Sequence, residues 1–284
     1  MNPNFQAVNK FNGHQGPVYS IFIQGNLLYS VSSDYSLKIW DILNQKIKKS
    51  FKLNALAYCI YVDHNNNILL GLNNGNIQVI KKDHSIKTIK TNESIAFFSF
   101  SESQNENEIF VGSSNGKLFI LNSKDYTIKS HINLNCGKIR KQFIRRDLLY
   151  LACQNGFIYK ISTSTKEIIN FINQHENGVN SICLESDNEN ILYSGGKDAL
   201  LKAFDISLNQ TVKIIPAHNY AIYDIIQLNQ TILVSCSRDK TIKVWDKKTM
   251  TIISRLDINS EGHKHSVNNI IKYKSNMFFS CSDD

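Results

Sequence analysis

The sequence lacks several features that mark common classes of protein. Only three prolines occur in 284 residues, and no apolar run approaches the 18 residues of a membrane-spanning helix. Residues 1–11 lack the basic, apolar and small-residue order of a signal peptide. The six cysteines are too widely spaced for a zinc or redox pair, so we predict no metal site and no cofactor. These absences predict a cytoplasmic protein without a transmembrane segment, the nucleus being left open.

A repeat is present instead. The segments SSDYSLKIWD (32–41) and SRDKTIKVWD (237–246) are near copies, and GKDALLKAFD (196–205) is a third version. The turn residue of this motif recurs at intervals of 40, 41, 40, 43, 41 and 45 residues, at Asp34, Asn74, Asn115, Asn155, Asp198, Asp239 and Asp284. A period of this length is typical of one four-stranded blade of a radial repeat.

Alternating apolar and polar residues flank each turn, and they predict two strands per unit. Asn-Gly at 74–75, 115–116 and 155–156 predicts a two-residue hairpin turn with both residues at positive φ. A further strand upstream has the pattern apolar-x-x-apolar at Val18/Ile21, Ala57/Ile60, Ile95/Phe98, Ile139/Gln142, Val179/Ile182, Ile222/Ile225 and Val267/Ile270, with Gln142 the exception. No 3.6-residue periodicity is convincing, so the chain is predicted to be all-β and a single domain over residues 1–284.

These motifs resemble the WD-repeat family across nearly the whole chain. The resemblance implies a seven-bladed β-propeller of four-stranded antiparallel blades. It also implies structural tetrads that link a His, a Ser, the turn Asp and a Trp. These are His14, Ser30, Asp34 and Trp40 in blade 1; His175, Ser194, Asp198 and Phe204 in blade 5; His218, Ser235, Asp239 and Trp245 in blade 6; and His263, Ser280 and Asp284 in blade 7.

The repeated His, Ser and Asp are interpreted as structural and not as a hydrolase triad, because a set that recurs blade by blade is a packing device without an oxyanion hole. Blades 2 to 4 replace the whole network at once. Their Ser positions are Leu70, Val111 and Leu151, and their Trp positions are Ile80, Leu121 and Ile161. A half-satisfied buried network is worse than none, which explains this coherent exchange.

The end of the ring is expected to be irregular. Residues Asn4 to Phe11 precede His14 as an outermost strand would, so the N-terminus is predicted to supply the outer strand of blade 7. The third strand of that blade is missing from the sequence. Either the chain is shortened, or a partner donates the strand.

The rim of the central channel is the first candidate partner-binding surface. The first variable residue of each inner strand gives Tyr19, Tyr58, Ala96, Arg140, Asn180, Tyr223 and Asn268, and the residue before the turn adds Lys197 and Arg238. Tyr and Arg anchor interfaces because they bury a large area with a polar end.

Positive charge gives the second candidate. Residues 45–170 contain 18 Lys or Arg against 9 Asp or Glu, while the remainder contains 14 against 15. The densest cluster is Lys138, Arg140, Lys141, Arg145 and Arg146 in blade 4. It is either a solvated basic face or a site for RNA, an acidic protein tail or an anionic membrane.

The sequence therefore predicts a non-enzymatic scaffold for protein–protein interaction in a multiprotein complex, with other proteins as partners. The alternative is a propeller that binds RNA or anionic lipid through the basic face of blades 2 to 4.

Overall fold

The structure, a computed structural model, describes residues 5–187 and 189–284, and over these residues it contains strands β1 to β26 and one short 3-10 helix (Ile258–Ser260). Six antiparallel four-stranded sheets, named blades 1 to 6, are formed. Their strands are β1 (Val18–Gln24), β2 (Leu27–Ser32), β3 (Ser36–Asp41) and β4 (Lys46–Lys52); β5 (Ala57–Val62), β6 (Ile68–Leu72), β7 (Asn76–Ile80) and β8 (Ile86–Lys90); β9 (Phe97–Ser103), β10 (Glu108–Ser113), β11 (Lys117–Asn122) and β12 (Ile128–Asn133); β13 (Ile139–Arg145), β14 (Leu148–Cys153), β15 (Phe157–Ser162) and β16 (Ile168–Asn173); β17 (Val179–Leu184), β18 (Ile191–Gly196), β19 (Leu200–Asp205) and β20 (Gln210–Pro216); β21 (Ile222–Gln227), β22 (Ile232–Ser237), β23 (Ile242–Asp246) and β24 (Ile252–Leu256). A two-stranded sheet follows, made of β25 (Val267–Lys274) and β26 (Met277–Ser282).

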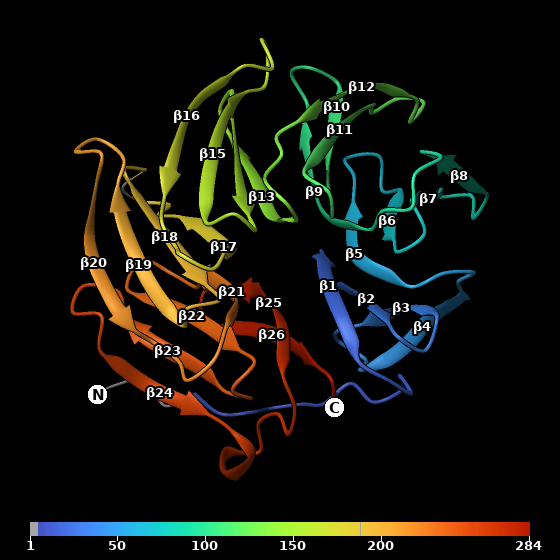
Figure 1. Cartoon of the computed structure of the whole chain (residues 1–284). Coiled ribbons are helices and arrows are strands. Elements are labelled where there is room, and N and C mark those ends of the chain that lie inside the picture. The colour runs from blue at the N-terminus through green and yellow to red at the C-terminus, as the bar shows by residue number, and fades with distance from the viewer. Residues whose placement is uncertain (1–4, 188) are drawn as a thin grey trace.

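The sheets are arranged in a ring around a central space, as Figure 1 shows. The first strand of each sheet lies innermost, and each inner strand contacts the inner strand of the next sheet. β25 contacts both β21 and β1, so the two-stranded sheet lies between blade 6 and blade 1 and closes the ring. The molecule is an all-β propeller with four-stranded antiparallel blades.

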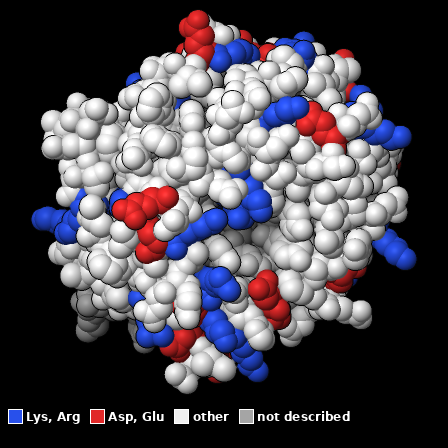
Figure 2. Space-filling view, in the orientation of Figure 1, with Lys and Arg blue, Asp and Glu red and all other residues white. Residues whose placement is uncertain are grey.

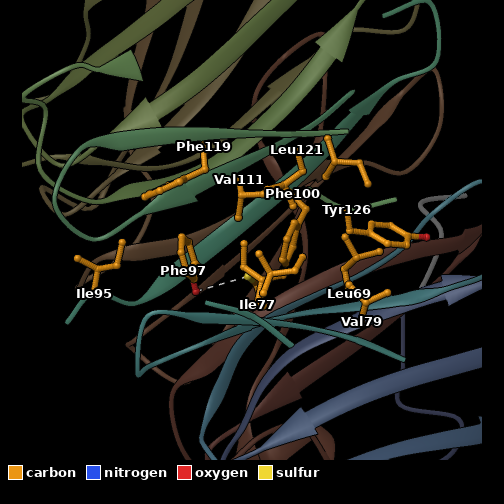
Figure 3. Close-up of a cluster of buried hydrophobic side chains, with 13 residues drawn as sticks. Leu69, Ile77, Val79, Ile95, Phe97, Phe100, Val111, Phe119, Leu121 and Tyr126 are labelled. Carbon is orange, nitrogen blue, oxygen red and sulfur yellow. Dashed lines mark hydrogen bonds between the residues drawn. The ribbon is translucent and has the colours of Figure 1, made fainter. Parts of the chain in front are cut away.

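Apolar side chains fill each space between neighbouring sheets. In blade 3, Ile109 and Val111 of β10 face blade 2, while Phe110 between them faces blade 4, because successive side chains of a strand point to opposite faces. Figure 3 shows the cluster between blades 2 and 3, where Phe97 packs edge to face on Phe119 with 5.5 Å between ring centroids. Burial on both faces explains why the second strands are almost continuously apolar.

The inner strand of every sheet has a β-bulge near its start. In blade 1 the strand register shifts between Val18 and Ser20, which leaves Tyr19 without a partner residue on β2. The same shift occurs in the other sheets at residues 57/59, 97/99, 139/141, 179/181, 222/224 and 267/269. Bulges redirect a side chain out of the regular pleat. The bulges therefore place one residue of each inner strand, such as Tyr19, outside the regular pairing at the same end of the channel.

The bulge corrects one part of the predicted strand pattern. In blade 3 the apolar pair is Phe97/Phe100 and not Ile95/Phe98, because Phe97 pairs with Ser113 and begins β9. Ala96 lies just before the strand, where its carbonyl accepts the Ser114 N–H and its own N–H donates to Ser114 Oγ at 3.0 Å. Phe98 is the bulge residue of blade 3. The segment IAFFSF satisfies the apolar-x-x-apolar pattern in both registers, so the pattern alone does not separate them.

The predicted turn type was also wrong. At the three Asn-Gly sites the left-handed residue is Gly, with φ of 78° at Gly75. Tyr35, with φ of 60°, holds the equivalent place in blade 1, and its N–H bonds to the carbonyl of Ser32. This is a three-residue hairpin with one left-handed residue rather than a two-residue turn. The residue before the left-handed one, such as Asp34, is thereby free to bond back to the following strand.

The predicted outer strand at the N-terminus is not formed. Asn4 lies outside the described residues, and residues 5–14 contain no strand. The segment runs from the β24 side of the ring to β1 (Figure 1) and is held by aromatic contacts, since Phe5 packs on Phe278 and Phe11 on Phe279. An outer strand needs a third strand to pair with, and the β25–β26 sheet provides none.

Replacing Phe97 with Ala is expected to lower the free energy of unfolding by about 3–5 kcal/mol, because it removes a fully buried ring and leaves a cavity. Phe171→Ala is the matched control, since Phe171 is 59% exposed. It should cost less than about 1 kcal/mol. Urea unfolding followed by Trp fluorescence measures both values, and equal losses would contradict the described packing.

Candidate functional site

Blade 1 contains a closed network of hydrogen bonds. His14 contacts Asp34 through Nδ1 at 2.8 Å and Ser30 Oγ through Nε2 at 2.7 Å, and the Trp40 indole N–H donates to the same Oγ at 2.8 Å. The backbone N–H of Gln15 also donates to Asp34. Blade 6 has the same network, with contacts of 2.8 to 2.9 Å among His218, Ser235, Asp239 and Trp245. The network ties the loop before the inner strand to the second and third strands and to the turn between them.

Two further sites hold a shorter form of this network. In blade 5, His175 contacts Asp198 and Ser194, each at 2.9 Å, and the buried Phe204 fills the Trp position without a donor. In the two-stranded sheet, His263 contacts Asp284 and Ser280, each at 2.8 Å. Blades 2 to 4 have apolar residues there instead, and Leu70, Val111, Leu151, Ile80, Leu121 and Ile161 are almost fully buried.

Burial and hydrogen bonding oppose each other in setting the pKa of the turn carboxylates. Burial alone would raise the pKa of Asp34, but hydrogen bonds from Ser36, the Gln15 N–H and His14 outweigh it and lower the pKa to about 2. The same balance holds the pKa of Asp239 far below its usual range. Burial lowers the pKa of His14 and His218, against the pull of their Asp partners.

Aromatic rings form a continuous arc on the rim of the channel. Tyr19 packs edge to face on Tyr58, and Tyr58 stacks on Phe98, each with 5.3 Å between ring centroids. We call Tyr19, Tyr58 and Phe98 the aromatic arc. The guanidinium of Arg140 lies 5.3 Å from the Phe98 ring centroid and continues the row. Phe98 was missed from the sequence because Ala96 was taken in its place.

Beyond Arg140 the rim is hollowed. A hollow of about 440 Å³ is lined by five of the nine residues predicted on the rim, Arg140, Asn180, Lys197, Tyr223 and Arg238, and by Asp198, Ala199, Asn219, Tyr220 and Ala221. Figure 2 shows Lys and Arg side chains gathered about the opening at the centre of the view. The bulge of the inner strands and the turn before Asp198 and Asp239 bring these residues together.

Asn180 and Asn268 have structural contacts on the same rim. The Asn180 side-chain amide donates to the Ile222 carbonyl at 2.8 Å, and that of Asn268 donates to the Val18 carbonyl at 2.9 Å. Each bond joins one inner strand to the next. The Asn268 bond is one of the contacts that close the ring between β25 and β1.

The predicted basic cluster is not one surface. Strand β13 runs through the molecule, and its seven residues span about 20 Å. Lys138 and Arg140 lie at the rim, Lys141 contacts the buried Asp224 at 2.7 Å, and Arg145 and Arg146 lie at the far end of the strand, both paired with Glu189. The prediction of a continuous basic face in blade 4 was therefore wrong. Strand alternation separates residues that are neighbours in sequence.

Asp224 is a polar centre that the sequence reasoning missed. Its carboxylate accepts from Lys141, from Ser181 Oγ at 2.7 Å and from the side-chain amide of Asn269 at 2.5 Å. The Asn269 carbonyl oxygen in turn accepts the backbone N–H of Ile21 at 3.0 Å. These bonds link the inner strands of blades 4, 5 and 6 to β25 and β1. A signal for this centre is present in the sequence, because Asp224 and its three side-chain partners occupy equivalent positions in their strands, directly after the bulge residue.

Other kinds of site are absent from the described part of the chain. Residues 5–187 and 189–284 contain no group of three His, Cys, Asp or Glu side chains placed to hold a metal ion. Across the same residues no helix has the length and apolar character to cross a membrane.

The free energy of unfolding is expected to fall as the pH is lowered. His14 and His218 have a pKa below 6.5 in the fold, so below pH 6.5 the unfolded chain binds protons that the folded protein does not. Asp34, with a pKa of about 2 against 3.8, adds a stabilisation that is complete above about pH 4 and is lost towards pH 2. Urea unfolding between pH 7 and pH 3 measures this slope.

The double variant Asp34→Asn/Asp239→Asn tests the assignment to these carboxylates. It should be less stable at pH 7 and should have a flatter dependence on pH below pH 4. A slope equal to that of the native chain would contradict the assignment.

Comparison with known proteins places the tetrads in a family. The model of the WD domain, G-beta repeat, matches residues 5–41, 166–205 and 209–246, which include the third strands of blades 1, 5 and 6. Similar proteins include the DDB1- and CUL4-associated factor 11 homolog of Caenorhabditis briggsae, 34% identical over 28% of this chain and 16% of that protein. The COMPASS component SWD3 of Saccharomyces cerevisiae is 26% identical over 66% of this chain and 61% of that protein. The human kinesin-like protein KIF21B is 22% identical over 98% of this chain and 19% of that protein.

The chain thus spans less than two thirds of the length of each of these relatives. The repeat matches fall on the blades that hold the hydrogen-bonded tetrads, and the ring of antiparallel sheets is the architecture that such repeats build. The chain therefore contains WD40 repeats at residues 5–41, 166–205 and 209–246, and it folds as a β-propeller.

Proposed function

We propose that this propeller is a non-enzymatic adaptor that binds partner proteins at the rim of its channel, in the cytoplasm or the nucleus. The observation that carries the proposal is the rim itself. It joins a row of half-buried, mutually packed aromatic rings to a hollow lined by Tyr and Arg. Such residues supply most of the binding energy of protein interfaces, because they bury large areas and keep a polar end.

The names of the relatives support an adaptor role. One is an associated factor of DDB1 and CUL4, and another is a component of COMPASS. Both names describe proteins that act together with others.

The tetrads favour a structural role over catalysis. Ser30 and Ser235 are buried, and each hydroxyl is held by both a His and a Trp. A nucleophilic Ser needs access to substrate and a nearby oxyanion hole. Repetition of the same set in several sheets is what packing requires.

The alternative, binding of RNA or anionic lipid by a basic face of blades 2 to 4, is weakened by the division of the basic cluster. Lys141, Arg145 and Arg146 are paired with acidic residues and lie away from the rim. Non-specific binding of nucleic acid draws on several cations along one track.

A pull-down with mass spectrometry at low and high salt tests the rim. The Tyr19→Ala/Tyr58→Ala/Tyr223→Ala variant should lose protein partners that the native chain retains at high salt, because the aromatic contact area is removed. The control Leu43→Ala/Ile258→Ala removes exposed apolar side chains elsewhere and should retain them. Retention by the rim variant, or capture of nucleic acid alone that salt releases, would contradict the proposal.

We propose further that the β25–β26 sheet is an incomplete seventh blade and that an added strand pairs with the open edge of β26. In the described residues, Ser280 Oγ has the His263 contact but no indole donor of the kind that Trp245 gives Ser235. Open strand edges bind extended segments through main-chain hydrogen bonds.

A peptide with the sequence of residues 239–247 (DKTIKVWDK), which includes the third strand of blade 6, is the probe for this edge. It should raise the melting temperature progressively as its concentration is increased, and it should protect the amides of β26 from hydrogen exchange. The same peptide with Ala in place of Trp should bind more weakly. Absence of any shift at millimolar peptide would overturn the proposal.

A further inference from the structure

We infer that the rim hollow binds an oxyanion group, a phosphate or a carboxylate, on an extended peptide of the partner. The inference rests on the proposed function, because it names the chemistry that the same rim recognises. Four cations surround the hollow and its edge: Lys138, Arg140, Lys197 and Arg238. We call them the cationic arc.

The charge of the cationic arc is uncompensated. In the described part of the chain, none of its four members has an ion pair, whereas Lys117, Lys129, Lys141, Lys166 and Lys247 are each paired with a carboxylate. Burial, together with the charges of Arg140 and Lys197, lowers the pKa of Lys138. Like charges held this close repel one another, and an anion between them would remove that repulsion.

The acidic residue in the wall of the hollow does not neutralise the arc. Asp198 directs both carboxylate oxygens to His175, and one of them also accepts the Leu200 N–H. Its carboxylate therefore belongs to the tetrad of blade 5. The hollow is left with donors at its lining: three cations, two Asn amides and two Tyr hydroxyls.

Arg140 is the strongest single indication. Its Nε is buried and has no hydrogen-bond partner among the described residues, while its guanidinium is held against Phe98. An unpaired buried donor on a charged group is costly, and burial lowers the pKa of this guanidinium. A ligand oxyanion would satisfy the guanidinium with the charge-assisted geometry that Arg favours.

The shape of the site favours a peptide over a nucleic acid. The cationic arc covers only blades 4 to 6, and the rim continues as the neutral aromatic arc in blades 1 to 3. A nucleic-acid backbone draws on several cations that follow successive phosphates along a groove. A peptide that places one anionic side chain in the hollow and apolar side chains on the aromatic arc would match both parts of the rim.

Three fluorescein-labelled peptides, Ala-Gly-Tyr-X-X-Gly-Ala, test the inference by fluorescence anisotropy with the full chain. X is phosphoserine, glutamate or glutamine. Each acidic peptide is expected to bind at least about tenfold more tightly than the glutamine peptide, because the glutamine peptide has no oxyanion at X. Comparison of the two acidic peptides distinguishes phosphate from carboxylate. Equal binding of all three, or tighter binding of an oligouridylate than of any peptide, would overturn the inference.

The variant Lys197→Glu/Arg238→Glu should lose at least about tenfold in affinity for the acidic peptide. The control Lys124→Glu/Lys248→Glu makes the same change in net charge at exposed turns between third and fourth strands, which lie at the other end of the blades. It should keep the affinity. Equal loss in both variants would mean that net charge alone acts, and would overturn the site.

The outcome separates this inference from the proposed function. If the aromatic variant loses its partners in the pull-down but no acidic peptide prefers the native chain, the rim binds proteins and the anion site is wrong. If neither experiment shows an effect of the rim, both are wrong.

Discussion

Every sheet of this molecule has two apolar faces, and the covering of those faces by neighbouring sheets is the constraint on which the fold depends. Ile109 and Val111 need blade 2, and Phe110 between them needs blade 4. A row of such sheets leaves two faces uncovered at its ends, whereas a ring leaves none. The small sheet β25–β26 suffices to close the ring, because Phe279 and Cys281 cover blade 1 while Phe278 covers blade 6.

The positions that form the tetrad of a blade are filled in two ways. Blades 1 and 6 use a complete polar network, and blades 2 to 4 use only apolar side chains. Blade 5 lies between them, since Phe204 replaces the Trp and the remaining His175, Ser194 and Asp198 still satisfy one another. Each solution leaves few polar atoms unpaired, which is the condition that buried groups must meet.

The sequence predicted the parts of the fold that repeat and missed those that depend on register or on contacts between blades. The turn Asp and the third-strand Trp are fixed by short spacing, so the strands around them were placed correctly. Phe98 was missed because IAFFSF allows two registers, and only pairing of Phe97 with Ser113 selects one. The polar centre at Asp224 joins residues that lie more than 40 positions apart in the sequence. The periodicity within one blade does not reveal such contacts.

The basic cluster shows the same limit in another form. Lys138 to Arg146 are close in sequence, but a strand that crosses the molecule from rim to far face divides them. A high density of Lys and Arg in the sequence is therefore a property of composition, and it does not show that these side chains share one surface. The hollow at the rim gathers its three lining cations from blades 4, 5 and 6, each of which contributes one.

The β26 strand also bears on how the molecule behaves in solution. Met277–Ser282 has the sequence MFFSCS, with no charged residue and no proline. Natural sheets use charged residues and proline at their edges to prevent edge-to-edge pairing, and β26 contains neither kind of residue. Over the described residues no strand covers this edge, and an edge without such residues is suited to pair with an extended segment.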